Sequence, residues 1–237
     1  MHIGVQLYSL REYIQENGLE EGLRMIAEAG FTGVEFAGFY GKSENEIQEL
    51  LNRYHLYPIS AHVGVEDMQE QIPMLKQMGI ECPVIPYQPF NMGISFEEGL
   101  SACKKAQELL RGFNMNIGYH NHAHEFKDGT DMVAKLAENI PELKLELDIF
   151  WLAVAGISAT DYMRAHKDRL IYLHIKELGE SADSINPIVG QGRANVAEVM
   201  RLGKEFGIEW SILEVENVDI PMSDYLKQSF KFMKKFA

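Results

Sequence analysis

Cysteine and long hydrophobic runs are scarce in this sequence, and each absence excludes a class of protein. Two cysteines in 237 residues, Cys82 and Cys103, cannot supply the disulfide framework of a small secreted domain, and they show no CxxC spacing. No apolar run approaches the roughly 20 residues needed to cross a bilayer, and the start, MHIGVQLYSLRE, lacks the basic and apolar regions of a signal peptide. We therefore expect a cytoplasmic protein with free thiols and no membrane partner.

Basic residues are also few. The chain carries 22 Lys and Arg against 35 Asp and Glu, a formal net charge of -13. Proteins that bind nucleic acid usually present a basic surface, because the neutralisation of phosphates supplies most of their non-specific affinity. The lysine cluster KFMKKF near the C-terminus is typical of the last turn of a helix, where cations interact favourably with the helix dipole. The charge balance predicts no nucleic-acid partner.

The sequence does contain a regular alternation of short apolar runs and longer amphipathic segments. The longer segments have apolar residues three and four positions apart, which is the pattern of helices that bury one face. Ser43, Ser95, Ser158 and Asn195 stand where helix N-caps are expected. The apolar runs predict strands at residues 2–8, 33–38, 56–63, 82–87, 115–121, 143–149, 170–176 and 210–216.

Repeated strand-then-helix units predict parallel strands joined by crossover helices. A closed (β/α)8 barrel and a doubly wound open sheet both satisfy this pattern. No GxGxxG motif or P-loop follows the first strand, which removes the usual signal of a dinucleotide-binding open sheet. Polar residues recur at the C-terminal ends of many strands, as in barrel enzymes. We therefore predict an α/β fold, a single (β/α)8 TIM barrel that forms one domain over residues 1–237.

The predicted strands end in carboxylates and imidazoles. Such groups are costly to bury inside apolar strands unless they are paired or bound to metal. Any one of them can be a hydrogen-bonded core group, but their convergence on the mouth of one barrel favours a functional site. In chain order they are Gln6, Glu35, His62, His120, His122, Glu125, Glu146, Asp148, His174, Lys176, Glu214 and Glu216.

The stretch GYHNHAHEF, residues 118–126, is the densest of these. The two-residue period of a strand places His120 and His122 on one face. We expect His124, past the end of the strand, to face solvent. A mixed set of His, Asp and Glu ligands suits Mn²⁺, Zn²⁺, Co²⁺ or Fe²⁺ better than calcium, which prefers oxygen alone.

These motifs resemble the sugar-phosphate isomerase/epimerase superfamily of xylose-isomerase-like TIM barrels. The resemblance covers essentially the whole chain, and HNHxxEF points to a bacterial subgroup within the superfamily. The segments that carry it are GVQLYSLR, GFTGVEFAGFYG, SAHV, YHNHAHEF, LELDIFWLAVAG, LHIKE, VGQG and ILEVEN.

The resemblance implies a divalent metal ion, which could be Mn, Zn, Co, Fe or Mg. Asp148, His174 and Glu214 match three of its ligands. In related epimerases the fourth ligand is a glutamate at the end of strand five, and this chain has His120 at the aligned position. The fourth ligand is therefore either His120 or Glu125, which would reach back from the loop.

The family's chemistry implies an isomerase or epimerase that deprotonates a sugar next to its carbonyl and forms an enediolate. Glu214 matches one of the family's bases, and Glu125 and His122 are the candidates for the second. Lys176 is placed to stabilise oxyanion charge. Relatives are often dimers or tetramers, which leaves a homo-oligomer open.

Five further residues are candidates for contact with a small sugar substrate. Gln6 ends the first predicted strand. Glu35 and His62 either hydrogen-bond neighbouring strands or contact substrate hydroxyls. Trp151 is either a rim aromatic or a platform for a sugar face, and Arg193 either binds a hydroxyl or phosphate or lies on a surface loop.

Three other functions compete with an isomerase. A metal-dependent dehydratase or lyase would use the same site. A non-catalytic sugar-binding barrel would not need carboxylates placed like Asp148 and Glu214. An endonuclease-IV-like phosphodiesterase would need more ligands, including a histidine where this chain has Trp151.

Overall fold

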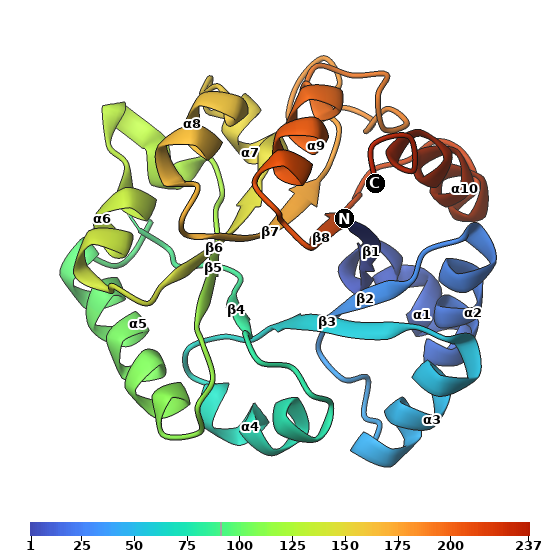
Figure 1. The fold of residues 1–237 in the computed structure, drawn as a ribbon, viewed down its shortest axis with the longest axis horizontal. Helices are drawn as coiled ribbons and strands as arrows, with labels where there is room; N and C mark the ends of the chain where they lie inside the picture. Colours follow the sequence, from blue (N-terminus) through green and yellow to red (C-terminus); the bar gives the residue numbers. More distant parts are fainter. Residues whose placement is uncertain (91) are drawn as a thin grey trace.

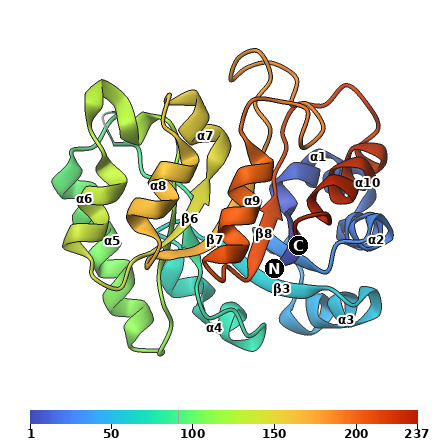
Figure 2. The same cartoon turned by 45° about the horizontal axis from the view of Figure 1, so that its top comes forward.

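The computed structural model describes residues 1–90 and 92–237, and within them parallel strands close into a barrel in the order β1 to β8 (Figures 1 and 2). Every neighbouring pair is parallel, and β1 closes the ring by pairing with β8. The predicted (β/α)8 barrel is confirmed. The strands are β1 (His2–Gln6), β2 (Gly33–Ala37), β3 (Tyr57–His62), β4 (Val84–Ile85), β5 (Gly118–His120), β6 (Lys144–Asp148), β7 (Leu170–Ile175) and β8 (Trp210–Leu213).

Helices form a ring around the barrel, as Figure 1 shows. In the part of the chain that the structure describes, no helix is long and apolar enough to span a bilayer. The helices are α1 (Arg11–Asn17), α2 (Leu19–Ala29), α3 (Glu44–Tyr54), α4 (Met68–Gln77), α5 (Phe96–Arg111), α6 (Met132–Asn139), α7 (Ile149–Val154), α8 (Ala159–His166), α9 (Val196–Glu205) and α10 (Met222–Met233), with 3₁₀ turns η1 (Leu7–Leu10) and η2 (His124–Gly129).

Two strands are much shorter than predicted. Pro83 and Pro86 flank β4, and because proline has no N–H to donate, the ladder stops at both of its ends. At β5 the side chain of Asn121 bonds to both the N–H and the carbonyl of Asp148, at 2.9 and 3.1 Å, in place of backbone ladder bonds. The chain is thereby free to turn after His120.

The predicted helix starts are mostly correct. Ser43 and Ser95 each form a capping box, and the Ser158 side chain accepts from the N–H of Asp161. Asn195 is the exception: it precedes α9 in a left-handed conformation, with φ 55°, and its side chain makes no cap bond. Asn195 therefore occupies the predicted N-cap position without making the capping bond.

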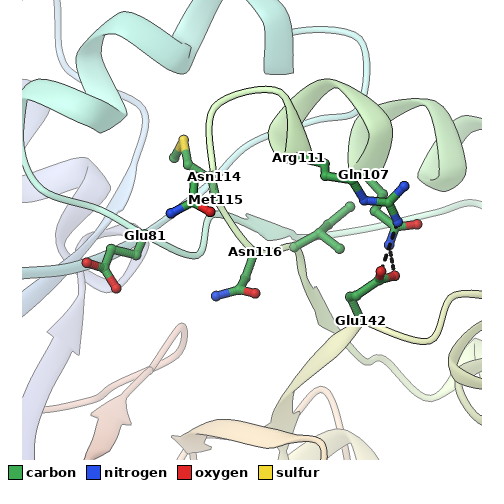
Figure 3. Close-up of a pocket in the computed structure, with 8 residues that line it drawn as sticks. Glu81, Gln107, Arg111, Asn114, Met115, Asn116 and Glu142 are labelled. Atoms are coloured by element: carbon green, nitrogen blue, oxygen red, sulfur yellow. Dashed lines mark hydrogen bonds and ion pairs between the residues drawn. The ribbon is translucent and has the colours of Figure 1, made fainter.

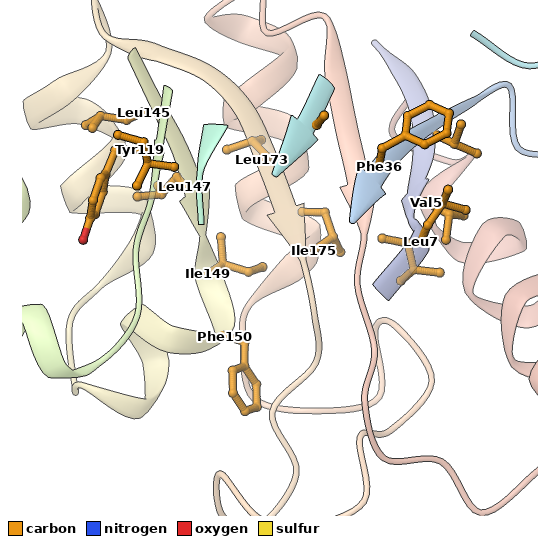
Figure 4. Packing of buried hydrophobic residues seen from close by; sticks show 14 of the residues in the cluster. Val5, Leu7, Phe36, Tyr119, Leu145, Leu147, Ile149, Phe150, Leu173 and Ile175 are labelled. Carbon is orange, nitrogen blue, oxygen red and sulfur yellow. The ribbon is translucent and has the colours of Figure 1, made fainter. Parts of the chain in front are cut away.

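Side chains alternate along each strand between the helices and the barrel interior. Leu145, Leu147, Leu173 and Ile175 point outward and pack under the helices (Figure 4). The residues between them therefore face inward, where polar groups meet. Below these polar groups the barrel is plugged by an apolar floor of Ile59, Val84, Tyr172, Trp210 and Ile212.

The floor depends on a glycine. A Cβ on Gly33 would lie 2.7 Å from the ring of Trp210 and 2.9 Å from Ile59. We expect Gly33→Ala to lower the free energy of unfolding by about 1–3 kcal/mol, as overpacked cores do. Gly112→Ala is the matched control, because Gly112 has helical φ and a Cβ there would meet only the Leu109 carbonyl oxygen, at 3.3 Å. Denaturant titration of both variants measures the effect, and equal stabilities would contradict this packing argument.

Candidate metal centre

Four side chains from the ends of adjacent strands bring one ligand atom each to a single point. His120 on β5, Asp148 on β6, His174 on β7 and Glu214 directly after β8 place these atoms within 4.8 Å of one another. All four residues are buried. His174 Nδ1 lies 3.2 Å from Glu214 Oε2 and 4.0 Å from Asp148 Oδ2, and His120 Nε2 lies 3.9 Å from the same Asp148 oxygen. We call this set the four-residue centre.

Two atoms of this centre are buried without a well-formed hydrogen bond. Asp148 Oδ2 has no hydrogen-bond partner among the described residues, and His174 Nδ1 has only the 3.2 Å approach to Glu214 Oε2, whose geometry is not that of a hydrogen bond. Leaving buried polar atoms unpaired is costly, and a shared cation would satisfy both. Burial, together with the nearby Glu214 carboxylate, raises the pKa of Asp148 to about 7. A cation at the centre would oppose both of these effects, and the donors of the centre fit a divalent ion.

A lower layer of carboxylates orients the two histidines. His174 Nε2 lies 2.6 Å from Glu35 Oε2, and His120 Nδ1 lies 3.1 Å from Glu146 Oε2. Because a neutral imidazole carries one N–H, a carboxylate on one nitrogen leaves the lone pair of the other directed at the centre. Burial opposes protonation of His174, but Glu146 and Glu35 outweigh it and raise its pKa well above the usual value. The carboxylates below thus favour a proton on His174, and a metal ion bound at the centre would compete with that proton for Nδ1.

Gln6, Glu35 and His62 belong to this layer. Gln6 donates to Glu35 at 2.6 Å, and the Ser60 hydroxyl donates to the other oxygen of Glu35. His62 Nε2 lies 2.7 Å from Glu146 Oε2. Gln6 and Glu35 are fully buried and do not line the pocket described below, whereas His62 does. This geometry matches the first alternative for Glu35, in which it hydrogen-bonds neighbouring strands instead of contacting substrate hydroxyls.

A cavity of about 450 Å³ opens above the centre at the C-terminal ends of the strands, where barrel active sites lie. We call it the mouth pocket. Its walls combine aromatic rings with imidazoles and carboxylates. It is lined by Tyr8, Ala37, His62, Pro86, Tyr87, His120, His122, Trp151, Glu214 and Glu216.

Trp151, His122 and Lys176 meet at one side of this pocket. The Trp151 and His122 rings are 5.1 Å apart. The Lys176 ammonium lies 5.1 Å from the Trp151 ring, forms an ion pair with Glu216 and stands 3.6 Å from Glu214 Oε1. Burial would lower the pKa of Lys176, but Glu214 and the neighbouring carboxylates outweigh it and raise that pKa. Lys176 is therefore a buried cation held by two carboxylates.

Glu125 lies outside the four-residue centre. It accepts from the Tyr119 hydroxyl at 2.9 Å and from the His122 N–H at 2.8 Å, on the outer side of β5. Burial raises its pKa to about 7. His124 was expected to face solvent and does not: it is half-buried, with Nε2 2.8 Å from the Gln88 carbonyl, because η2 folds back against the loop after β4.

Arg193 does not line the mouth pocket. Its guanidinium donates to the carbonyls of Gly179, at 2.8 Å, and Glu180, which matches the surface-loop alternative. The same loop contains a buried carboxylate that sequence reasoning missed. Glu177 accepts from the backbone N–H groups of Gly192 and Ala194. Ser60, Tyr8 and Tyr87 were also missed, since isolated residues of these types carry no signal in the sequence.

A second cavity, of about 350 Å³, lies at the opposite end of the barrel (Figure 3). Residues before β5 and β6 line it, and Arg111 and Gln107 both bond to Glu142 there. Its described lining brings together no set of ligands like that of the centre. It provides control positions for the experiments below.

Comparison with known proteins agrees with this geometry. The family model for the xylose isomerase-like TIM barrel matches residues 23–236, and the chain belongs to this family. No curated protein matches the chain. The neighbours named below are less than 25% identical to it, so they support the fold alone.

Three solved structures illustrate the likeness. A sugar phosphate isomerase/epimerase from Parabacteroides distasonis ATCC 8503 has 21% identity over 98% of this chain and 92% of its own, with TM-score 0.81. The probable 3-DHS dehydratase AsbF from Bacillus anthracis has 15% identity over 99% of each chain, with TM-score 0.79. The IOLI protein, described with a bound zinc atom, has 12% identity over 100% and 98%, with TM-score 0.80.

Proposed function

We propose that the protein is a divalent-metal-dependent sugar isomerase or epimerase. The observation that carries this proposal is the four-residue centre, in which donors from four strand ends converge and two of the four residues, His120 and Glu214, line the mouth pocket. His120, Asp148, His174 and Glu214 would hold the ion, and two imidazoles with two carboxylates suit Zn²⁺, Mn²⁺, Co²⁺ or Fe²⁺. When bound, the ion would polarise the substrate carbonyl and stabilise the enediolate formed on deprotonation.

Glu214 is the best-placed proton acceptor. Its carboxylate lines the mouth pocket. Burial would raise its pKa, but the His174 imidazole beside it outweighs burial and holds that pKa well below the usual value, so Glu214 is ionised. Its position in the pocket beside Lys176, rather than a high basicity, favours it as the base. Lys176, 3.6 Å away, stays protonated and supports negative charge in the transition state. The chain thus supplies one carboxylate base and one fixed cation side by side.

His122 is the second candidate base on the wall of the mouth pocket. Burial lowers its pKa to about 2, so its imidazole is neutral, and its Nδ1 has no hydrogen-bond partner among the described residues. A neutral imidazole with an unpaired nitrogen suits hydrogen bonding to a substrate hydroxyl. Proton return from a single base on one side of the sugar favours isomerisation, whereas epimerisation needs a donor on the opposite face.

A dehydratase is the second candidate. Elimination of a hydroxyl requires a proton donor near the leaving oxygen, and the protonated Lys176 lies in reach of the pocket wall. The neighbour named as a probable 3-DHS dehydratase shares the barrel. Product analysis separates the two reactions, since only elimination forms a new double bond with loss of water.

Solvent-deuterium incorporation tests the proposal. Metal-loaded protein is incubated with ketoses, inososes and keto-glycosides in deuterated water, and NMR detects deuterium at the carbon next to the carbonyl. We expect Glu214→Gln, measured at saturating metal, to slow incorporation by about 100-fold or more. Glu81→Gln, exposed at the other end of the barrel, is the matched control. Incorporation at the wild-type rate by Glu214→Gln would remove Glu214 as the base.

A second comparison decides between His120 and Glu125 as fourth ligand. Because only His120 lies in the four-residue centre, His120→Asn should lower metal content and Glu125→Gln should retain it. His55→Asn is the control for loss of an imidazole. His55 adopts a left-handed conformation, which asparagine tolerates as well as histidine does. Elemental analysis gives the result, and loss of metal from Glu125→Gln alone would reverse the assignment.

A further inference from the structure

We infer that the mouth pocket takes an uncharged sugar and discriminates against phosphorylated ones, an inference that rests on the proposed function. Among the described residues that line this pocket there is no lysine or arginine, whereas two carboxylates, Glu214 and Glu216, face it. A phosphate group remote from the reacting carbon would need a cation or a set of free N–H donors of its own. The described residues of the pocket lining supply no such cation.

The cations around the rim are already engaged. Lys176 is buried and paired with Glu216. Arg11 lies with its guanidinium over the Tyr8 ring at 4.2 Å and donates to the Tyr8 carbonyl. Arg193 bonds to the carbonyls of its own loop, as described above. An incoming phosphate would have to break these contacts to gain a partner.

Backbone amides in the loop after β7 and at the start of α7 are engaged as well. In barrels, phosphate commonly binds the loops that follow strands seven and eight. Here the loop after β7 contains its own anion: the Glu177 carboxylate accepts from the N–H groups of Gly192 and Ala194 and is 1% exposed. At the start of α7, the Trp151 N–H bonds to Asp148. These three N–H groups are therefore not free to bind a phosphate.

The walls suit an uncharged polyhydroxylated ring instead. Tyr8 and Tyr87 are 43% and 39% exposed, although large aromatic side chains gain free energy when covered. Both line the mouth pocket with Trp151. A sugar offers C–H faces that stack on such rings, and its hydroxyls can donate to Glu214 and Glu216. These contacts require no charge on the ligand.

Calorimetry on the metal-loaded protein tests the inference with matched pairs such as fructose with fructose 6-phosphate and ribulose with ribulose 5-phosphate. We expect each neutral sugar that binds to do so at least about 10-fold more tightly than its phosphate ester. Glu216→Gln should narrow that ratio, because it removes a wall carboxylate and frees Lys176, whereas Glu81→Gln should leave it unchanged. Phosphate esters that bind as tightly as their parents, or no binding by any neutral sugar, would overturn the inference.

The outcome is separable from that of the proposed function. Neutral sugars that bind preferentially but exchange no deuterium would refute the isomerase proposal and leave the charge preference standing. Deuterium exchange into phosphate esters as readily as into neutral sugars would support the isomerase proposal and refute the preference for uncharged sugars.

Discussion

Replacing Asp148 with asparagine is expected to abolish tight metal binding while the barrel stays folded. The asparagine carbonyl can still accept from the Trp151 N–H, as Asp148 Oδ1 does at 2.9 Å, so the start of α7 is preserved. The amide that replaces Oδ2 carries no negative charge and removes one donor from the centre. Since lesser changes around metal sites cost 10- to 100-fold in affinity, we expect a loss of more than about 100-fold.

Two measurements check this expectation. Elemental analysis gives the metal content, and thermal unfolding with added Zn²⁺, Mn²⁺ or Co²⁺ shows whether the ion stabilises the protein, as any ligand specific for the folded state must. Glu81→Gln is the control for replacing a carboxylate by an amide. Retention of the wild-type shift in melting temperature by Asp148→Asn would exclude Asp148 from the ligand set.

Replacing Glu146 with glutamine is expected to cause the largest loss of stability. Glu146 is fully buried, and its Oε2 faces nitrogens of His62, His120 and His174 at 2.7, 3.1 and 3.2 Å. Glutamine keeps the shape but removes the charge that these imidazoles share. Removal of one partner from a buried charged network typically costs about 3–5 kcal/mol. Metal affinity should also fall by about 10- to 100-fold, because His120 loses its orienting carboxylate.

Glu142→Gln is the matched control for Glu146→Gln. Glu142 also pairs with a basic group, Arg111, but both side chains are about half exposed, so water can replace the contact. Denaturant titration at neutral pH without metal isolates the effect on stability from the effect on metal binding. Equal unfolding midpoints for the two variants would show that the Glu146 carboxylate contributes no more to the free energy of unfolding than a surface ion pair does.

The sequence was sufficient to predict the barrel because each unit repeats the same physical pattern. Short apolar runs followed by amphipathic segments are buried when helices cover a parallel sheet, and the polar strand ends together with the missing GxGxxG motif favour a closed barrel over an open sheet. The prediction failed where local chemistry overrides hydrophobicity. Residues 82–87 look like a strand, but two prolines reduce the ladder to Val84–Ile85. The short helix α7 was missed because its capping group, Asp148, was interpreted only as a site residue.

The site was predicted as a set of residues but not as an arrangement. Strand alternation correctly directs Glu146, Asp148 and His174 into the barrel. Asp148 and His174 belong to the four-residue centre, whereas Glu146 lies in the layer below it. This difference depends on the height of each residue along the barrel axis. That height is fixed by strand tilt and by register shifts, which occur at Val34/Glu35 and Leu145/Glu146. Such shifts follow from packing across the whole sheet, so they cannot be predicted from the sequence of one strand.

The split of the site between the two halves of the chain has a consequence for assembly. The four donors lie between residues 120 and 214, but the first two strands supply Glu35, which bonds to His174 from below, and Gln6, which donates to Glu35. The donors can therefore be brought together by the second half alone, but they are aligned only when β1 docks against β8. During refolding, the acquisition of full metal affinity should thus coincide with closure of this last seam of the ring.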